Sequence, residues 1–273
     1  MQQLGQVCII TGGASGIGRA LALELGRRGA TLVVSDIDLA GAQTVAEAIN
    51  AMRPDSASAV ALDVTDGEAV AALVADTVQS HGRLDLMFNN AGISITGDAR
   101  DLSIAHWRRV IDVNLMGVIY GSDAAYKAMA AQGSGHIVNI ASLAGLVPFP
   151  TNAPYGATKH AVVGLSQALR AEGEDLGVRV SVVCPGFVAS NIFNATEVVN
   201  ASREKLIANI PFKKVAVEEA AERILDGVAR NHAIIIFPGY ARALWWGYRL
   251  VPNLLAPLGR RLIRDLRKIR GGH

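Results

Sequence analysis

The sequence predicts an α/β fold in which a doubly wound parallel sheet carries helices on both faces. Three observations support this prediction. Short apolar runs rich in Val and Ile alternate with longer segments whose apolar residues recur at helical spacing. The first apolar run ends in a glycine-rich turn. Polar residues follow several of the later runs, at the sheet edge where open α/β sheets bind ligands.

The composition fits one large domain with a sizeable core, because 51% of the 273 residues are apolar and 18% are charged. Cys8 and Cys184 both stand in apolar runs, which favours buried thiols in a reduced, cytoplasmic protein. No His/Cys grouping has metal-ligand spacing, so no metal is expected. The sequence shows no signal-peptide pattern, and no run approaches the roughly 18 apolar residues of a membrane span.

The first predicted strand and its exit turn cover residues 6–13. The turn reads TGGASGIG over 11–18 and opens a segment with helical periodicity. Glycines let the backbone approach a pyrophosphate, and the first amide groups of the helix then face the phosphates. A strand before the turn and a helix after it distinguish a dinucleotide site from an ordinary turn. We therefore expect a dinucleotide on Gly12, Ser15, Gly16, Ile17 and Gly18.

The second predicted strand, 31–36, ends in Asp36. An acid about 20 residues after the glycines can accept hydrogen bonds from both ribose hydroxyls of an adenosine, and it repels a 2′-phosphate. Ile37 and Asp38 supply no cation that could offset this repulsion. The sequence therefore favours NAD over NADP. Alternatively, Asp38 is only the N-cap of the next helix and Asp36 is merely exposed, which does not exclude the first interpretation.

Further polar groups follow the next two strands. A strand predicted over 58–64 ends in Asp63 and Val64, where Asp63 could meet the adenine. After a helix over 66–81, a fourth strand runs into a second glycine turn within 84–92. Such turns are often only turns, but this one can bring backbone and amide groups against a cofactor. The residues concerned are Asn90, Ala91 and Gly92.

Asn114 lies among apolar neighbours in a long helix predicted over 106–132. A buried amide needs hydrogen-bond partners. The side chain is therefore either a structural bridge or part of a site.

Ser142, Tyr155 and Lys159 are the candidate catalytic residues. Ser142 follows an apolar strand at 136–141, and Pro154 suits the first turn of the next helix. Tyr155 and Lys159, four residues apart on that helix, share one face. A free tyrosine has a pKa of about 10 and is a poor base, but a nearby ammonium lowers that pKa. The arrangement indicates proton transfer at an alcohol or carbonyl whose oxygen Ser142 holds, with a purely structural Tyr–Lys pair as the alternative.

Together these motifs resemble those of short-chain dehydrogenases/reductases with a single Rossmann domain. The matching motifs are TGGASGIG at 11–18, DV at 63–64, NNAG at 89–92, Asn114, Ser142, YGATK at 155–159 and PG at 185–186. The resemblance implies a seven-stranded parallel sheet and a catalytic set of Asn114, Ser142, Tyr155 and Lys159. Tyr155 is then the acid/base and Ser142 orients the substrate oxygen. Lys159 binds the nicotinamide ribose and lowers the tyrosine pKa, while Asn114 holds a relay water.

The strand predicted over 178–186 ends in the PG motif. Family members commonly continue with a valine and then a threonine that contacts the nicotinamide amide. Here the valine is present, and Ser190 keeps the hydroxyl of the threonine but lacks its methyl group. The resemblance thus implies cofactor contacts at Pro185, Gly186, Val188 and Ser190.

Residues 191–214 are expected to cover the substrate, since loops on a fixed scaffold carry specificity. The predicted pocket is apolar, which favours a lipophilic secondary alcohol or ketone over a sugar or an acid. Alternatively, its apolar residues pack only on one another. The pocket residues are Leu143, Phe149, Phe187, Ile192 and Phe193, beside Ser142 and Tyr155. A helix at 217–231 and a last strand at 233–239 follow, and in the family these take part in homodimer or homotetramer contacts.

The catalytic domain is expected to span 1–240 and a basic amphipathic helical extension to span 241–273. Residues 240–273 hold eight Arg or Lys and one acid, whereas the rest of the chain has a net charge of −5. Apolar residues recur at helical spacing, and two tryptophans precede them. The extension packs over the substrate cleft, packs on a neighbouring subunit, or contacts an anionic membrane surface. No nucleic-acid motif accompanies the charge, so no nucleic acid is expected.

The sequence thus predicts a cytoplasmic, NAD-dependent oxidoreductase that transfers a hydride between the nicotinamide and a hydrophobic secondary alcohol or ketone. One alternative is an NADPH-dependent ketoreductase, including the acyl-carrier-protein type, against which Asp36 and Ala14 argue. Another is a non-catalytic dinucleotide-sensing or membrane-associated binding protein. The complete set of four candidate catalytic residues argues against that alternative.

Overall fold

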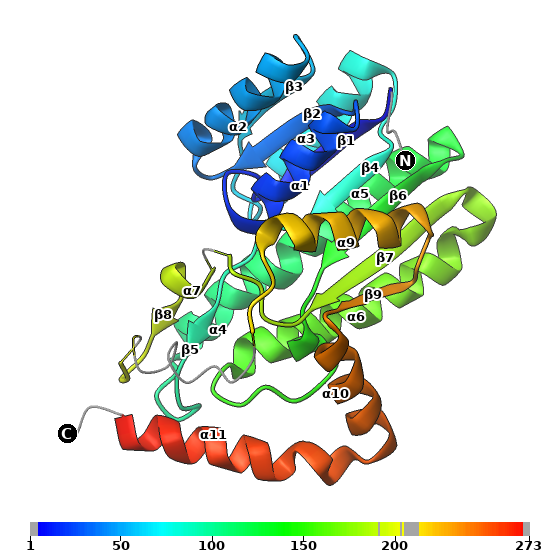
Figure 1. Cartoon of the computed structure of the whole chain (residues 1–273). Coiled ribbons are helices and arrows are strands. Elements are labelled where there is room, and N and C mark those ends of the chain that lie inside the picture. Colours follow the sequence, from blue (N-terminus) through cyan, green and yellow to red (C-terminus); the bar gives the residue numbers. More distant parts are fainter. Residues whose placement is uncertain (1–4, 191, 203, 205–212, 270–273) are drawn as a thin grey trace.

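The computed structural model describes residues 5–190, 192–202, 204 and 213–269 (Figure 1). Its centre is a seven-stranded sheet in the order β3-β2-β1-β4-β6-β7-β9. Every neighbouring pair in this sheet is parallel. The strands are β1 (Val7–Thr11), β2 (Thr31–Asp36), β3 (Ala57–Ala61), β4 (Leu86–Asn89), β6 (Gly135–Ile140), β7 (Val178–Pro185) and β9 (Ile234–Phe237). A separate parallel pair joins β5 (Ile95–Thr96) to β8 (Glu197–Val198).

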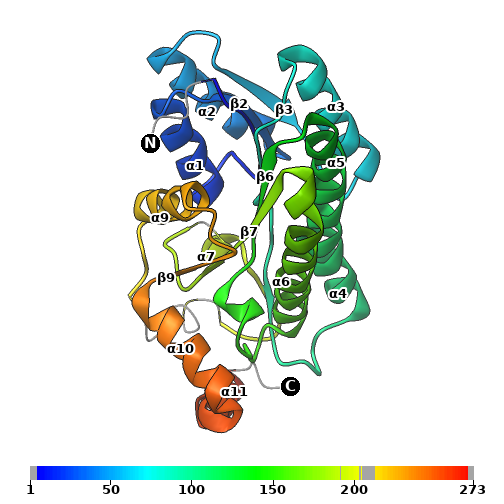
Figure 2. The same ribbon diagram turned by 90° about the vertical axis from the view of Figure 1, so that its right-hand side faces the viewer.

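Helices cover both faces of the large sheet, as the sequence predicts. Helices α1, α2 and α9 lie on one face, and α3, α5 and α6 lie on the other (Figure 2). The main helices are α1 (Gly16–Arg27), α2 (Leu39–Met52), α3 (Gly67–His81), α4 (Ile104–Ile111), α5 (Gly117–Gln132), α6 (Ala153–Gly173), α9 (Val217–Ala229), α10 (Gly239–Leu250) and α11 (Ala256–Ile269). Shorter helical segments are α7 (Ile192–Ala195), η1 (Asp112–Met116), η2 (Leu143–Gly145), η3 (Glu174–Leu176) and η4 (Pro252–Leu255).

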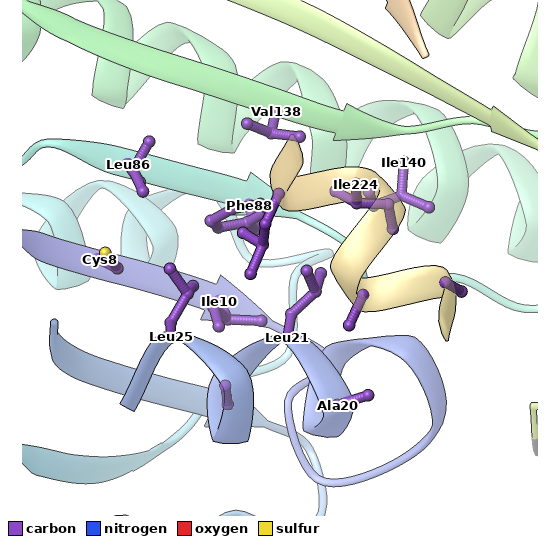
Figure 3. Close-up of a cluster of buried hydrophobic side chains, with 14 of the residues drawn as sticks. Cys8, Ile10, Ala20, Leu21, Leu25, Leu86, Phe88, Val138, Ile140 and Ile224 are labelled. Atoms are coloured by element: carbon purple, nitrogen blue, oxygen red, sulfur yellow. The ribbon is translucent and has the colours of Figure 1, made fainter. Parts of the chain in front are cut away.

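The central strands are continuous apolar runs because helices bury both of their faces. Strand β1 is buried along its whole length. In Figure 3, Ile10 of β1 and Phe88 of β4 lie close to Leu21 of α1 and Ile224 of α9, all within one buried cluster. Close packing of this kind fixes the separation of the helices from the sheet. It therefore also fixes the positions of the loops at the strand ends.

The pairing of β1 with its two neighbours shows where the sheet is expected to bind a ligand. Strand β1 pairs with β2 on one side and with β4 on the other, so the chain changes direction across the sheet at β1. In doubly wound sheets, ligands bind outside the carboxyl ends of the strands at such a switch point. The glycine turn at 11–18 follows β1 and the turn at 89–92 follows β4, so both motifs meet at this point.

Two predicted elements differ from the structure. The strand predicted over 58–64 ends at Ala61, because Asp63 makes a local turn instead: its Oδ1 accepts from the amide and hydroxyl of Thr65 at 2.9 and 2.8 Å. The helix predicted over 106–132 begins at Ile104 and contains a π-helical turn, η1. Such π turns often occur at functional sites.

The C-terminal extension starts as an integral part of the fold. Helix α10 packs through Ala241, Leu244, Trp245 and Tyr248 against a buried cluster that includes residues of β7 and β9. After η4, α11 runs across the end of the molecule (Figure 1).

Candidate active site

A cleft of about 1750 Å³ lies at the carboxyl edge of the sheet, between the glycine turn after β1 and helix α11. Most of the site residues predicted from the sequence line it: Gly12, Ser15, Gly16, Ile17, Asp36, Asp63, Val64, Asn90, Ala91, Gly92, Ser142, Leu143, Phe149, Tyr155, Lys159, Pro185, Gly186, Phe187, Val188, Ser190 and Ile192. Gly18 and Asn114 are buried and do not line the cleft. The side chain of Phe193 lies outside the part of the chain that the structure describes.

The turn after β1 needs glycine for conformation and for packing. Gly12 and Gly16 have φ of 65° and 54°, a region that favours glycine. A Cβ at Gly18 would lie 2.1 Å from the carbonyl oxygen of Gly12, so the helix can start this close to the strand only without a side chain. Asn90 Nδ2 clamps the turn by donating to the carbonyls of Thr11 and Gly12 at 2.9 and 3.0 Å.

This turn fits the pyrophosphate of a dinucleotide. The first amide groups of an α-helix have no partner within the helix and carry the positive end of its dipole. In α1 the first two of these amides belong to Gly16 and Ile17, which line the cleft. The turn therefore offers donors for phosphate oxygens without a competing side chain.

Asp36 lies at the end of β2, half-buried on the cleft wall. Its Oδ2 accepts from the amide of Ala14 at 2.9 Å and its Oδ1 from the amide of Asp38 at 3.0 Å. These backbone donors fix the carboxylate and leave it further acceptor capacity. Asp38 itself accepts from the amide of Gly41 at 3.0 Å, which confirms that it caps α2.

Ser142, Tyr155 and Lys159 converge just beyond the end of β6. The hydroxyl of Ser142 accepts from the amide of Ala144 at 3.1 Å and lies near enough to Tyr155 to act on the pKa of its phenol. Lys159 Nζ lies 5.5 Å from the centroid of the Tyr155 ring and donates to the carbonyl of Ile140 at 2.8 Å. The one-face arrangement expected from their spacing on α6 is thus present.

Burial controls the ionisation of this group. Burial raises the pKa of Tyr155 above its ordinary value of 10, while the neighbouring hydroxyl of Ser142 acts in the opposite direction. Burial also lowers the pKa of Lys159 to about 8. The pKa of Tyr155 is therefore raised, whereas the sequence led us to expect that Lys159 would lower it. At neutral pH Tyr155 is a phenol that can donate a proton, and Lys159 changes its charge within reach of physiological pH.

Asn114 is fully buried in η1, and its amide is a bridge to the loop after β4. Its Oδ1 accepts from the amide of Ile93 and its Nδ2 donates to the carbonyl of Ile93, both at 2.8 Å. A Cβ at Gly92 would lie 3.3 Å from Asn114 Oδ1 and 3.7 Å from Lys159 Nζ. Asn114 therefore lies directly behind the cleft wall, close to the lysine, and fixes the loop that shapes it.

Aromatic and aliphatic side chains form one wall of the cleft beyond Tyr155, and α11 adds Arg260, Arg261, Arg264 and Arg267 to the lining. The rings of Phe149 and Phe187 lie 6.2 Å apart, centroid to centroid, at an angle of 52°. The amide of Phe187 donates to the hydroxyl of Tyr240 at 2.7 Å, so α10 holds the loop after β7 in place. In the segment 191–214, Ile192 and Val198 line the cleft, whereas residues 191, 203 and 205–212 lie outside the described residues.

Sequence reasoning missed one part of the cleft and left the placement of another open. Asn152 Oδ1 accepts from the hydroxyls of Ser94 and Thr96 at 3.0 and 2.8 Å, which ties β5 to the start of α6. Helix α11 contributes Leu262, Ile263 and other residues to the wall. The helical spacing of the tail was the available signal, and it left open which surface the helix covers. The structure places it against the cleft.

This fold and site define a dinucleotide-binding α/β enzyme with a Ser–Tyr–Lys group at the carboxyl edge of its sheet. A family model described as short chain dehydrogenase matches residues 6–199, and the chain belongs to this family. It is an oxidoreductase acting on CH–OH groups.

Several known proteins are similar to this chain. An oxidoreductase of Mycobacterium tuberculosis named SadH is 38% identical over 249 residues, which cover 88% of each chain. A cyclohexanol dehydrogenase of Acinetobacter sp. is 43% identical over 184 residues, which cover 67% of this chain and 73% of the relative. A short chain dehydrogenase/reductase from Burkholderia phymatum, solved in complex with NAD, superposes with a TM-score of 0.85 at 28% identity and covers 93% and 96% of the two chains. Within the described residues, no helix is both long and apolar enough to cross a membrane.

Proposed function

We propose that this chain is an NAD-dependent dehydrogenase that transfers a hydride between the nicotinamide and the carbinol carbon of a hydrophobic secondary alcohol, or of the ketone in the reverse direction. One observation carries the proposal. Ser142, Tyr155 and Lys159 lie in a single cleft that continues from the glycine turn on one side to an apolar wall on the other. The cleft therefore offers adjoining places for a dinucleotide and a lipophilic substrate.

The glycine turn and Asp36 would hold the adenosine diphosphate half of the cofactor, with Asp63, Val64 and the turn at 90–92 beside it. Bound NAD supplies the hydride acceptor, or NADH the donor. The preference for NAD rests on Asp36, whose partners are backbone amides and whose charge would repel a 2′-phosphate. The NAD in the Burkholderia phymatum neighbour agrees with this assignment.

Ser142 and Tyr155 would share the substrate oxygen. The hydroxyl of Ser142 orients it, and Tyr155 takes the alcohol proton during oxidation or returns it during reduction. An ammonium at Lys159 favours the phenolate that this exchange requires and would also bind the nicotinamide ribose. Asn114, buried close to Lys159, would hold the relay water, while Pro185, Gly186, Val188 and Ser190 would meet the nicotinamide.

The substrate class rests on the apolar wall of Leu143, Phe149, Phe187 and Ile192. The Acinetobacter relative acts on cyclohexanol by its name, which agrees with a lipophilic secondary alcohol. Members of the family are typically oligomeric, and we propose a homodimer or homotetramer for this chain.

Calorimetry with NAD and NADP tests the cofactor assignment. Wild-type protein should bind NAD more tightly, and Asp36→Ala should reduce that preference at least tenfold, because a hydrogen bond to a charged group contributes about 1.5–3 kcal/mol. Asp38→Ala, which removes a carboxylate two residues away that does not line the cleft, should leave the preference unchanged. Tighter NADP binding by the wild type, or an unchanged preference in Asp36→Ala, would contradict the assignment.

A further inference from the structure

We propose that the outer side of the C-terminal extension docks on an anionic membrane surface. The docking surface consists of Arg242, Trp246, Arg249, Leu250 and Val251, the outward side chains of α10 and its end. This proposal goes beyond hydride transfer and depends on different residues, since none of these five lines the cleft.

Helix α10 has two different sides. Ala241, Leu244, Trp245 and Tyr248 recur at helical spacing and pack on the buried cluster at β7 and β9. The opposite stripe carries the docking surface, in which Trp246 is 49% exposed, Leu250 75% and Val251 55%. Three large apolar side chains thus lie exposed within six residues, although α10 already has a buried side. A cluster of this kind marks an interaction surface rather than incomplete packing.

The charge around this surface specifies an anionic partner. Residues 240–273 hold eight Arg or Lys against one acid. Helix α10 contains no acidic residue, and its Arg242 and Arg249 are both exposed. Cations flanking exposed Trp and Leu side chains are typical of helices that lie in a lipid headgroup layer. Each cation near an anionic bilayer contributes about 1 kcal/mol.

A second copy of the chain fits this surface less well. Most homodimers are built on a twofold axis, which would bring the same patch of both chains together. That contact would bring Arg242 and Arg249 of both copies into one interface without an acid of α10 to offset them, so the net positive charge would oppose it. An anionic bilayer instead complements these cations and also accepts the apolar side chains.

The docking surface also adjoins the substrate cleft. Leu244 and Tyr248, on the inner side of α10, line the cleft, and so do η4 and α11. Docking through the outer side would therefore hold the cleft beside the lipid phase. A lipophilic alcohol or ketone concentrates in that phase, so the surface would bring the enzyme to its substrate.

Sedimentation of the full-length protein with phosphatidylcholine vesicles, with and without phosphatidylglycerol, tests the proposal. The protein should pellet with the anionic vesicles and be released by high salt. Trp246→Gln/Leu250→Gln and, separately, Arg242→Glu/Arg249→Glu should each weaken vesicle binding at least tenfold. The matched control is Ile104→Gln/Leu176→Gln, which removes two apolar side chains of the body that are 67% and 44% exposed. This control should pellet like the wild type.

The assay needs no turnover, so its outcome is independent of the proposed dehydrogenase activity. NAD binding by calorimetry checks that each variant is folded. If Trp246→Gln/Leu250→Gln does not fold, Arg242→Glu/Arg249→Glu still tests the proposal. Wild-type protein that stays in the supernatant, or folded surface variants that pellet like the wild type, would overturn the proposal. So would a wild type that does not pellet but loses its oligomeric mass in Trp246→Gln/Leu250→Gln, because that result would make the surface an interface between copies.

Discussion

Lys159 and Tyr155 show how burial sets the chemistry of single residues in this cleft. The pKa of Lys159 is lowered to about 8 because its ammonium is buried, 3% exposed, at the end of β6. The same burial raises the pKa of the neighbouring phenol. Tyr155 is therefore a neutral phenol beside a charged lysine. The Lys159 ammonium can favour the phenolate during proton transfer.

We predict that Lys159→Met stabilises the protein at neutral pH while it lowers turnover at least a hundredfold. The folded pKa of about 8 lies below the ordinary value of 10.5, so the unfolded chain binds more protons between these values. The free energy of unfolding of the wild type should therefore rise with pH in this window by up to about 1.4 kcal/mol per pH unit relative to the variant. Urea unfolding of both proteins across the window measures this difference. If the free energy of unfolding changes with pH in the same way in both proteins, the Lys159 ammonium is not buried.

The sequence predicted which residues form the candidate site better than it predicted what their atoms do. Ser142, Tyr155 and Lys159 stand at fixed distances from a strand end, so motif spacing was enough to place them together. Asn114 is different, because both halves of its amide bond to Ile93. That pairing depends on how η1 packs against the loop after β4, and neither spacing nor composition specifies such packing.

Helix α11 shows the same limit for a whole element. Its apolar spacing predicted a helix with one buried side but not the surface that this side covers. In the structure, Arg267 Nε donates to Asp98 Oδ2 at 2.8 Å, across 169 residues of sequence. The Asp98 side chain is 7% exposed, and its hydrogen bond with Arg267 lowers its pKa. This ion pair fastens α11 to the loop after β5.

We predict that Arg267→Gln loosens α11 and raises KM for bulky substrates several-fold more than for small ones. The ion pair is partly exposed and Asp98 keeps a second partner, Arg100, at 3.2 Å, so the global stability should fall by only about 1 kcal/mol or less. Hydrogen exchange of α11 and KM for a series of alcohols measure the effect. Lys268→Gln is the control, because Lys268 pairs with Asp265 of the same helix.

The low pKa of Asp98 adds a pH criterion to this comparison. A lowered folded pKa means that the contribution of the pair is present above the ordinary carboxyl value and is lost as pH falls through the folded value. The stability difference between wild type and Arg267→Gln should therefore disappear in acid. Equal hydrogen exchange of α11 in the wild type and in Arg267→Gln at neutral pH would contradict the role of the ion pair.

At the scale of the whole molecule, the sheet was the most predictable feature. Parallel strands covered on both faces must be continuous apolar runs, so the runs ending at Thr11, Asp36 and Ile140 were visible in the sequence. Strand ends were less predictable, because local turns compete with the hydrogen bonds between strands. The turn formed by Asp63 and Thr65 after β3 is an example. The cleft itself combines residues of β1 with residues of α11, and no local pattern shows how far apart two such segments lie.

The proposed reaction is oxidation of lipophilic secondary alcohols by NAD, with Tyr155 as the acid/base. The most direct measurement is NADH formation from secondary alcohols of increasing apolar size, by wild type and by Tyr155→Phe, with NAD affinity measured in parallel. We predict turnover that improves with apolar size and falls about a hundredfold or more in Tyr155→Phe, while the variant still binds NAD. Turnover that survives the substitution would contradict the role of Tyr155, and a wild type that binds NAD but oxidises none of the alcohols would contradict the proposed reaction.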